Sequence, residues 1–231
     1  MNILAIQKDM WMLGFMKAIA IFTKIIENKE KKMSVPIGFK RLTIRIKDGK
    51  TAVPDKTQFV IEGKKDNGGM VSAKVSGLAV DAVKSYSSNK VYSISGKGVG
   101  DGKVEFDIMD FPEKIKNAVL GIVASSNGVY KATADRTSPY CSILLEDVTP
   151  KGHPYLMAFV DGMFSSDGLE FNTVQGKQGE LPSEAISFAI GSDDNGLYYS
   201  TFVGTGAPTD AAGIAEIKAD ALMVAAPAGG A

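Results

Sequence analysis

The sequence predicts a mainly β protein, a β-sandwich or barrel with one short flanking α-helix and an alanine-rich C-terminal segment. Three observations lead to this prediction: turn-forming Asx-Gly pairs are frequent, the segments between them alternate apolar with polar residues, and helical periodicity is confined to two stretches. Asx-Gly is the strongest short-range hairpin signal because both residues tolerate a positive φ. Seven pairs occur, at Asp48-Gly49, Asn67-Gly68, Asp101-Gly102, Asn127-Gly128, Asp161-Gly162, Asp167-Gly168 and Asn195-Gly196.

Two segments show the alternation most clearly. Residues 42–47 read Leu-Thr-Ile-Arg-Ile-Lys and residues 104–108 read Val-Glu-Phe-Asp-Ile, so each is expected to bury one face of a strand. Further strands are predicted at residues 57–62, 70–80, 90–95, 140–148, 155–164, 169–174, 185–190 and 197–203. Many short strands separated by turns are typical of a sandwich or a barrel.

Two stretches have helical character. Residues 112–120 begin with Pro112 in the first turn and end before Gly121, and their apolar residues share one face, so this helix is expected to cover an open end or edge of the sheet. Residues 210–224 are alanine-rich and mildly amphipathic. We predict that residues 209–231 form a C-terminal arm that is helical and then flexible.

The most apolar part of the chain lies near its N-terminus, at residues 10–26. Lys17 and Lys24 interrupt it, so it is too short and too charged for a transmembrane helix. A signal-like segment is one interpretation, because Ala18-Ile19-Ala20 resembles a small-residue cleavage site.

A second interpretation is that translation starts at Met33. Lys29-Glu30 can be encoded by a purine-rich sequence that pairs with ribosomal RNA, at the correct distance upstream of that methionine. We therefore expect residues 1–32 to be a non-native leader and residues 33–208 to form the β domain.

Charge and cysteine content exclude several classes of protein. Lys and Arg together number 26, as do Asp and Glu, so the broad positive surface of a phosphate-binding protein is missing. Outside residues 1–32 the chain is slightly acidic, with a net charge of about −3. Cys141 is the only cysteine, which excludes an intrachain disulfide and indicates synthesis in a reducing cytoplasm.

No pattern indicates catalysis or a bound cofactor. His153 is the only histidine, so a zinc site or a histidine base would depend on it alone. Residues 96–102 are rich in glycine but precede a strand, whereas a phosphate cradle needs a helix N-terminus. Residues 193–196 lack the spaced oxygen ligands of a calcium loop. We therefore predict a protein that is not an enzyme and has no catalytic residue, cofactor or metal site.

Several short motifs occur in a characteristic order and spacing between residues 38 and 203. They are Gly38-Phe39-Lys40-Arg41-Leu42, Ser88-Asn89-Lys90-Val91-Tyr92, Phe111-Pro112-Glu113 with Leu120-Gly121, Gly128-Val129-Tyr130, Ser138-Pro139-Tyr140-Cys141 and Asp161-Gly162-Met163-Phe164. In this order and spacing the chain resembles the major tail proteins, or tail tube subunits, of long non-contractile-tailed phages and prophages. No single motif is decisive.

The resemblance implies a structural virion protein that is made in the cytoplasm of the bacterial host and located in the phage tail. Six copies would close into a ring, and rings would stack into a tube whose lumen passes DNA without binding it specifically. The resemblance further implies tape-measure, tail terminator and baseplate proteins as partners, and no membrane. A slightly acidic body agrees with such a lumen, because cationic walls would bind phosphates.

Polarity and length single out the surfaces expected to join subunits. The segment from Asp48 to Met70 is long and polar for a hairpin connection and is predicted to contact the next ring, with residues 34–39 and 204–224 as arms. The predicted self-assembly residues are Asp48, Gly49, Lys64, Lys65, Asp66, Asn67, Ser34 and Phe39.

Two alternative functions stay open at this point. A phage-tail-like bacteriocin would use the same tube, and sequence does not separate it from an infectious phage. A carbohydrate-binding or adhesion β-sandwich would present clustered exposed aromatic residues, for which Tyr86 and Tyr198-Tyr199 are the hints.

Overall fold

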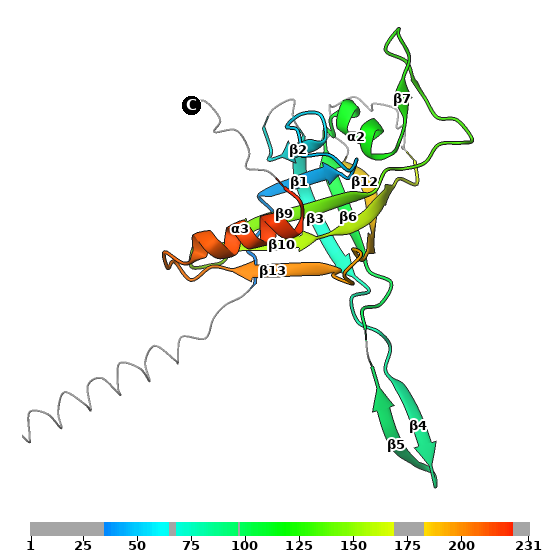
Figure 1. The fold of residues 1–231 in the computed structure, drawn as a ribbon, viewed down its shortest axis with the longest axis vertical. Helices are drawn as coiled ribbons and strands as arrows, with labels where there is room; N and C mark the ends of the chain where they lie inside the picture. The colour runs from blue at the N-terminus through cyan, green and yellow to red at the C-terminus, as the bar shows by residue number, and fades with distance from the viewer. Residues whose placement is uncertain (1–34, 65–67, 97, 169–182, 224–231) are drawn as a thin grey trace, which may run out of the picture. The chain divides into compact units, whose positions relative to one another are not determined.

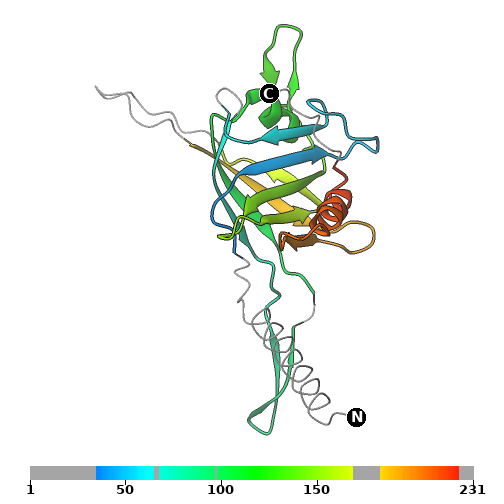
Figure 2. The ribbon, with the colours of Figure 1, turned by 90° about the vertical axis from the view of Figure 1, so that its left-hand side faces the viewer.

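The body of the fold consists of two antiparallel sheets that pack face to face, as shown in a computed structural model that describes residues 35–64, 68–96, 98–168 and 183–223 (Figures 1 and 2). One sheet has the order β13-β10-β9-β1-β2, formed by Tyr199–Val203, Pro154–Phe159, Cys141–Val148, Arg41–Ile46 and Gln58–Ile61. The other has the order β11-β12-β6-β3, formed by Asp161–Ser165, Ser183–Gly191, Lys103–Met109 and Gly69–Ser76. Two further two-stranded sheets are described: β4-β5, formed by Val83–Ser87 and Lys90–Ser95, and β7-β8, formed by Val123–Ala124 and Tyr130–Lys131. The predicted mainly β sandwich or barrel is confirmed.

The core lies between the sheets and is built from the apolar positions of the alternating strands. Ile44 of β1 pairs with Ile143 of β9, and both are buried. Opposite them, three phenylalanines of the second sheet form a row in which Phe164 lies 6.3 Å from Phe106 and 4.9 Å from Phe188, measured between ring centroids. Rows of this kind fix the register of each strand, because a slip of one residue would turn the apolar set to the other face.

The predicted strand at residues 155–164 is divided between the two sheets. β10 ends at Phe159 and β11 begins at Asp161, so the chain crosses from one sheet to the other at Val160. A Cβ at Gly162 would overlap the carbonyl of Ala189 and the ring of Phe188, so only glycine fits at this crossing. Asp161-Gly162 therefore marks a corner of the sandwich rather than the hairpin turn that was predicted.

The predicted short helix is present as α2, Glu113–Val119. Phe111 and Val119 are buried in the core between the sheets, so the helix covers one end of that core. Gly121 adopts a φ of +68°, and a Cβ there would overlap the carbonyl of Thr137. This is the glycine position expected just after the end of a helix.

A second helix, α3, spans Asp210–Asp220 and lies against the outer face of the first sheet (Figure 1). Ile217 and Ala221 are buried there against Leu144 and Leu156. The Ser142 hydroxyl of β9 donates a hydrogen bond of 2.5 Å to the carbonyl of Ala221. The described part of the segment predicted as a C-terminal arm thus packs on the sheet of its own chain.

Cys141 gives a first test of the packing. Its thiol is buried at the start of β9, and this burial, followed by the nearby Asp161 carboxylate, raises its pKa to about 12. Because the thiolate is the reactive form, we expect the native protein at pH 8 to resist iodoacetamide and the protein in guanidinium to react fully. Intact-mass measurement distinguishes the two, and rapid alkylation of the native chain would contradict the buried position.

Candidate functional site: assembly surfaces

A long β-hairpin lies between β3 and β6. Its strands are β4, Val83–Ser87, and β5, Lys90–Ser95, and every residue in them is exposed. Ser88 and Asn89 have φ values of +50° and +62°, the pattern of a two-residue type I′ turn. The hairpin extends beyond the ends of β3 and β6 (Figures 1 and 2). The strand at residues 90–95 is confirmed, whereas β4 was not predicted.

The two faces of the hairpin differ in chemistry. Cross-strand partners share a face, and the pairs Lys84 with Ile94 and Tyr86 with Val91 fall on one side. The pairs on the other side are Val83 with Ser95, Ser85 with Ser93 and Ser87 with Lys90. We call the first side, Lys84, Tyr86, Val91 and Ile94, the hairpin apolar face. Tyr86 is 68% exposed and Ile94 is 63% exposed, although both are large apolar side chains.

The root of the hairpin has no space for side chains. Gly77 adopts a φ of +72°, and a Cβ on it would overlap the carbonyl of Asp101. A Cβ on Gly100 would lie 2.6 Å from the carbonyl oxygens of Gly77 and Ala79. The two backbone segments therefore cross in direct contact, which fixes the direction in which the hairpin leaves the sandwich.

An open cleft of about 480 Å³ lies beside β3, between that strand, β9, β10 and residues 36–39. Phe39, Val71, Leu145 and Met157 provide much of its apolar lining. We call it the β3 cleft. Val71 is 53% exposed at its mouth, so the cleft is accessible in the described part of the chain.

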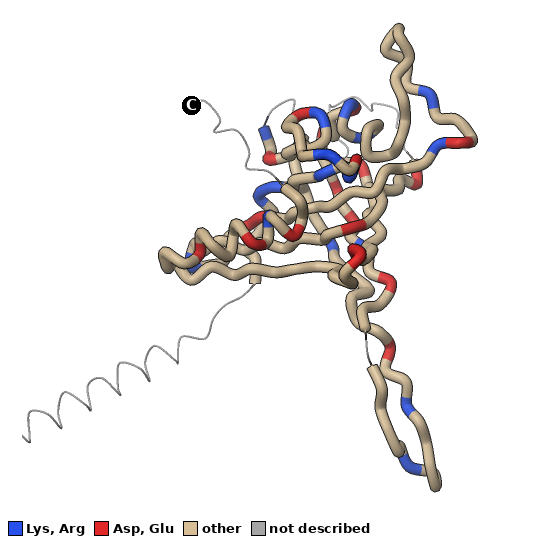
Figure 3. The backbone as a smooth tube through the Cα atoms, viewed as in Figure 1, with Lys and Arg blue, Asp and Glu red and all other residues tan. Residues whose placement is uncertain are grey.

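The charges of the hairpin and the cleft are opposite in sign. Residues 83–95 carry Lys84 and Lys90 and no acidic residue, so the hairpin is basic along its length (Figure 3). Among the described residues that line the β3 cleft, Glu146 and Asp147 are the charged ones. Asp147 accepts a hydrogen bond of 2.5 Å from the backbone N–H of Gly38, which holds its carboxylate at the cleft wall.

The segment from Asp48 to Met70 is not one long loop. It contains β2, which confirms the strand predicted at residues 57–62, pairs with β1 and buries Phe59 and Ile61. The prediction of a single contact loop over the whole segment is therefore corrected, because a core strand divides it into two shorter connections.

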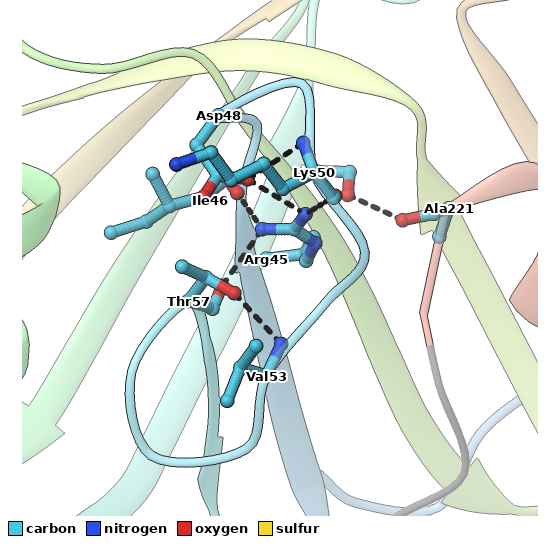
Figure 4. Close-up of polar contacts among 8 residues, drawn as sticks. Arg45, Ile46, Asp48, Lys50, Val53, Thr57 and Ala221 are labelled. Carbon is cyan, nitrogen blue, oxygen red and sulfur yellow. Dashed lines mark hydrogen bonds and ion pairs between the residues drawn. The ribbon is translucent and has the colours of Figure 1, made fainter.

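A buried arginine, Arg45, holds the connection between β1 and β2 in place through hydrogen bonds (Figure 4). The Arg45 side chain, 2% exposed, donates to the carbonyls of Ile46, Lys50 and Thr57 and to the Asp48 carboxylate, with 3.0 Å from Nη2 to Oδ1. This hydrogen bond holds the pKa of Asp48 below its usual value. Asp48, one of the predicted assembly residues, is thus engaged with its own chain.

The other predicted assembly residues are distributed over different parts of the structure. Phe39 stacks on the core residue Phe106, with ring centroids 6.3 Å apart. Lys64 is exposed and pairs with Glu62 at 2.7 Å. Gly49 is exposed with open space around it. Ser34, Lys65, Asp66 and Asn67 lie outside the described residues, as does the strand predicted at residues 169–174.

The motif residues fall into three places. Asn89, Lys90 and Tyr92 lie in the hairpin turn and β5, whereas Phe111, Pro112 and Gly121 bound α2. Pro139 and Tyr140 precede β9, where Tyr140 bridges to Met163 of β11 and links the two sheets at that corner. The motifs thus mark the corners and turns of the fold.

In the described ranges, no group of three or more His, Cys, Asp and Glu side chains is arranged to hold a metal ion. None of the helices in those ranges has the length and apolar character needed to cross a membrane.

A family model described as phage tail tube protein matches residues 30–204. No curated protein matches the chain.

Proposed function

The chain belongs to the phage tail tube protein family, and from this premise we propose that its copies assemble through the β4–β5 hairpin into stacked hexameric rings that pass DNA. Membership of the family makes it a structural protein of the virion tail. The hexamer, the stacking and the passage of DNA are parts of the proposal.

The exposed hairpin apolar face carries this proposal. Tyr86, Val91 and Ile94 lie on one side of a two-stranded ribbon, and an isolated ribbon of this kind is marginally stable in water. Contiguous apolar side chains on a surface are typical of contacts with another protein, since burying them is favourable. A chain that functions by joining to copies of itself accounts for this exposure.

The remaining features of the proposal follow from charge and from the family. A body with a net charge of about −3 outside residues 1–32 repels phosphates, so DNA would pass through the lumen without specific binding. We propose synthesis in the host cytoplasm, and a tape-measure protein, a tail terminator and a baseplate as partners.

The proposed domain division retains residues 33–208 as the tube domain, residues 1–32 as a leader and residues 209–231 as a C-terminal arm. Gly49 and Lys64 stay candidates for contacts between rings because both are exposed. Asp48 would act there indirectly, by holding the connection between β1 and β2 in shape. Ser34, Lys65, Asp66 and Asn67 also stay candidates, while Phe39 would act from the wall of the β3 cleft.

The proposal is tested by electron microscopy of the purified chain and of the double variant Tyr86→Ser/Ile94→Ser. We expect the unchanged chain to form rings or tubes and the double variant to stay monomeric, because it loses the apolar contact. Both side chains are exposed, so the thermal unfolding midpoint should be the same for the two proteins.

The matched control is Ser85→Ala/Ser93→Ala on the other face of the same hairpin, which should assemble normally. An unchanged chain that stays monomeric at high concentration would contradict the proposed function. Tubes of normal length from the Tyr86→Ser/Ile94→Ser variant would show that the hairpin is not the contact.

A further inference from the structure

We propose that the hairpin apolar face of one copy docks in the β3 cleft of a neighbouring copy. This inference rests on the proposed self-assembly and names the surface that receives the hairpin. It commits to one occupant of the cleft, a second copy of this chain.

The two surfaces match in polarity. The hairpin presents Tyr86, Val91 and Ile94 from a narrow two-stranded ribbon, and the β3 cleft is an open apolar hollow that exposes Val71. Seating such side chains in an apolar hollow removes both surfaces from water. Anchors of this kind, an aromatic side chain in a pocket, contribute most of the binding energy in protein interfaces.

The two surfaces also match in charge. Lys84 lies on the hairpin apolar face itself, and Lys90 lies beside the turn. Glu146 and Asp147 lie at the wall of the β3 cleft. Glu146 is paired with Arg41 at 3.2 Å and with Lys218 at 3.8 Å in its own chain, so the Asp147 carboxylate is the acceptor proposed for Lys84. Placing Lys84 near Asp147 would favour this partner over another hairpin, which would bring lysines together.

The geometry of β3 favours docking between copies over docking within one copy. Val71 of the cleft lies on β3, and Gly77 of the hairpin root directly follows the last residue of that strand. The hairpin extends away from the sandwich beyond this end of β3 (Figure 1). At the root of the hairpin the backbones of Gly77 and Gly100 are in close contact, since a Cβ on Gly100 would lie 2.6 Å from the carbonyl oxygen of Gly77, and this contact directs the hairpin away from its own cleft.

A contact between two different surfaces has a consequence for assembly. Such a heterologous contact does not close after two copies, so it generates rings or open helical stacks. Each copy would offer one hairpin and one cleft, and every added copy would leave one of each free. Growth of this kind suits a tube.

The test uses engineered cysteines. We expect chains carrying Ile94→Cys and chains carrying Val71→Cys, assembled together and treated with a short bis-maleimide, to give a covalent dimer. Either variant alone should stay monomeric under denaturing conditions, because the contact joins unlike surfaces. The native Cys141 is buried and should give no background. Both substituted positions are exposed, so the variants should fold.

The matched control is Ser85→Cys mixed with Val71→Cys, which tests the other face of the hairpin. Dimers from Ile94→Cys but not from Ser85→Cys would support the docking. The chain with both Val71→Cys and Ile94→Cys should give a ladder of covalent oligomers. A monomer with an internal crosslink would overturn the inference by showing that the hairpin folds back.

A second variant makes the inference independent of crosslinking geometry. Val71→Lys places a positive charge near the position proposed for Lys84, so this variant should form no tubes. The matched control is Val123→Lys on β7, Val123–Ala124, where Val123 is also an exposed valine, at 74%, but lies outside the proposed contact. This control should form tubes normally. If tubes form normally with Val71→Lys and no Val71–Ile94 dimer appears, another occupant fills the cleft and the docking is wrong while the tube function stands. If the unchanged chain forms no tubes, the proposed function itself fails.

Discussion

Replacing residues 48–68 by a two-residue turn is expected to leave no folded subunit. The replacement removes β2, and with it the buried side chains of Phe59 and Ile61. Losing two large core side chains costs roughly 5–10 kcal/mol, which is comparable with the total stability of a typical domain of about 5–15 kcal/mol. The loss also exposes the backbone edge of β1 that β2 covers.

The turn would also fail to span the distance. β1 ends beside the start of β2, because Arg45 pairs with Gln58, whereas β3 begins just after the turn that follows the end of β2. The chain must therefore travel from Lys47 back to at least the level of Leu42, which lies opposite Ile61, about 17 Å for five steps along the strand. A two-residue turn between Lys47 and Gly69 provides three steps, which reach about 11 Å at most.

Circular dichroism during thermal unfolding checks this result. The matched control replaces residues 81–97 of the hairpin by a short turn, which removes a segment of comparable length whose described residues, 81–96, include none of the buried core. Val80 and Gly98 lie close together, since a Cβ on Gly98 would be 3.8 Å from Val80, so a short turn joins them. We expect the control to unfold in a cooperative transition. A cooperative transition in the first variant would contradict the assignment of β2 to the core.

Alternation predicted the strands that have one face in the core. β1, β6 and β12 were found within a few residues of their ends, because each places apolar side chains between the sheets. The polar face of β1 is also buried, however: Thr43 and Arg45 lie under neighbouring segments of the chain. The alternation of apolar and polar residues predicts that one face of a strand is buried. It does not predict whether another segment of the chain covers the polar face.

The strand β4 could not be predicted for a related reason. Both of its faces are exposed, so its side chains show no period that relates to a core. Its turn, Ser88-Asn89, adopts the type I′ conformation that was sought at Asx-Gly pairs. By contrast, Asp161-Gly162 lies at the crossing between sheets, since a tight approach of backbones selects glycine as strongly as a turn does.

Polar sequence predicted an assembly surface in the segment from Asp48 to Met70, because polar segments are usually exposed whether or not they make contacts. The hairpin apolar face was not predicted, since Tyr86, Val91 and Ile94 resemble core residues in the sequence and their exposure depends on the fold. The β3 cleft could not be predicted, because β3 belongs to one sheet and β9 and β10 to the other, so these strands meet only where the two sheets pack together.

Replacing Arg45 with methionine is expected to lower the free energy of unfolding by about 2 kcal/mol, the usual cost of leaving buried carbonyls without donors. The carbonyls of Ile46 and Lys50 would lose the guanidinium, whereas that of Thr57 keeps the N–H of Ile46 at 2.7 Å. The connection between β1 and β2 would lose the group that joins its two ends. Methionine keeps much of the buried stem, and it removes Nε, which has no hydrogen-bond partner in the described part of the chain. These two gains keep the loss moderate.

Urea unfolding followed by fluorescence or circular dichroism measures this effect. The matched variant is Asp48→Asn, which keeps a carbonyl oxygen for the 3.0 Å contact and leaves the three backbone acceptors of Arg45 untouched, so its loss should be clearly smaller. An Arg45→Met protein as stable as the unchanged chain would show that the connection is held by its own turn, in which Thr57 Oγ1 accepts from the N–H of Val53 at 2.9 Å. Electron microscopy of folded Arg45→Met subunits tests separately whether the connection between β1 and β2 contacts the next ring, because loss of such a contact would prevent tubes. We expect such tubes to form, because the hairpin apolar face and the β3 cleft do not include Arg45 or the residues it holds.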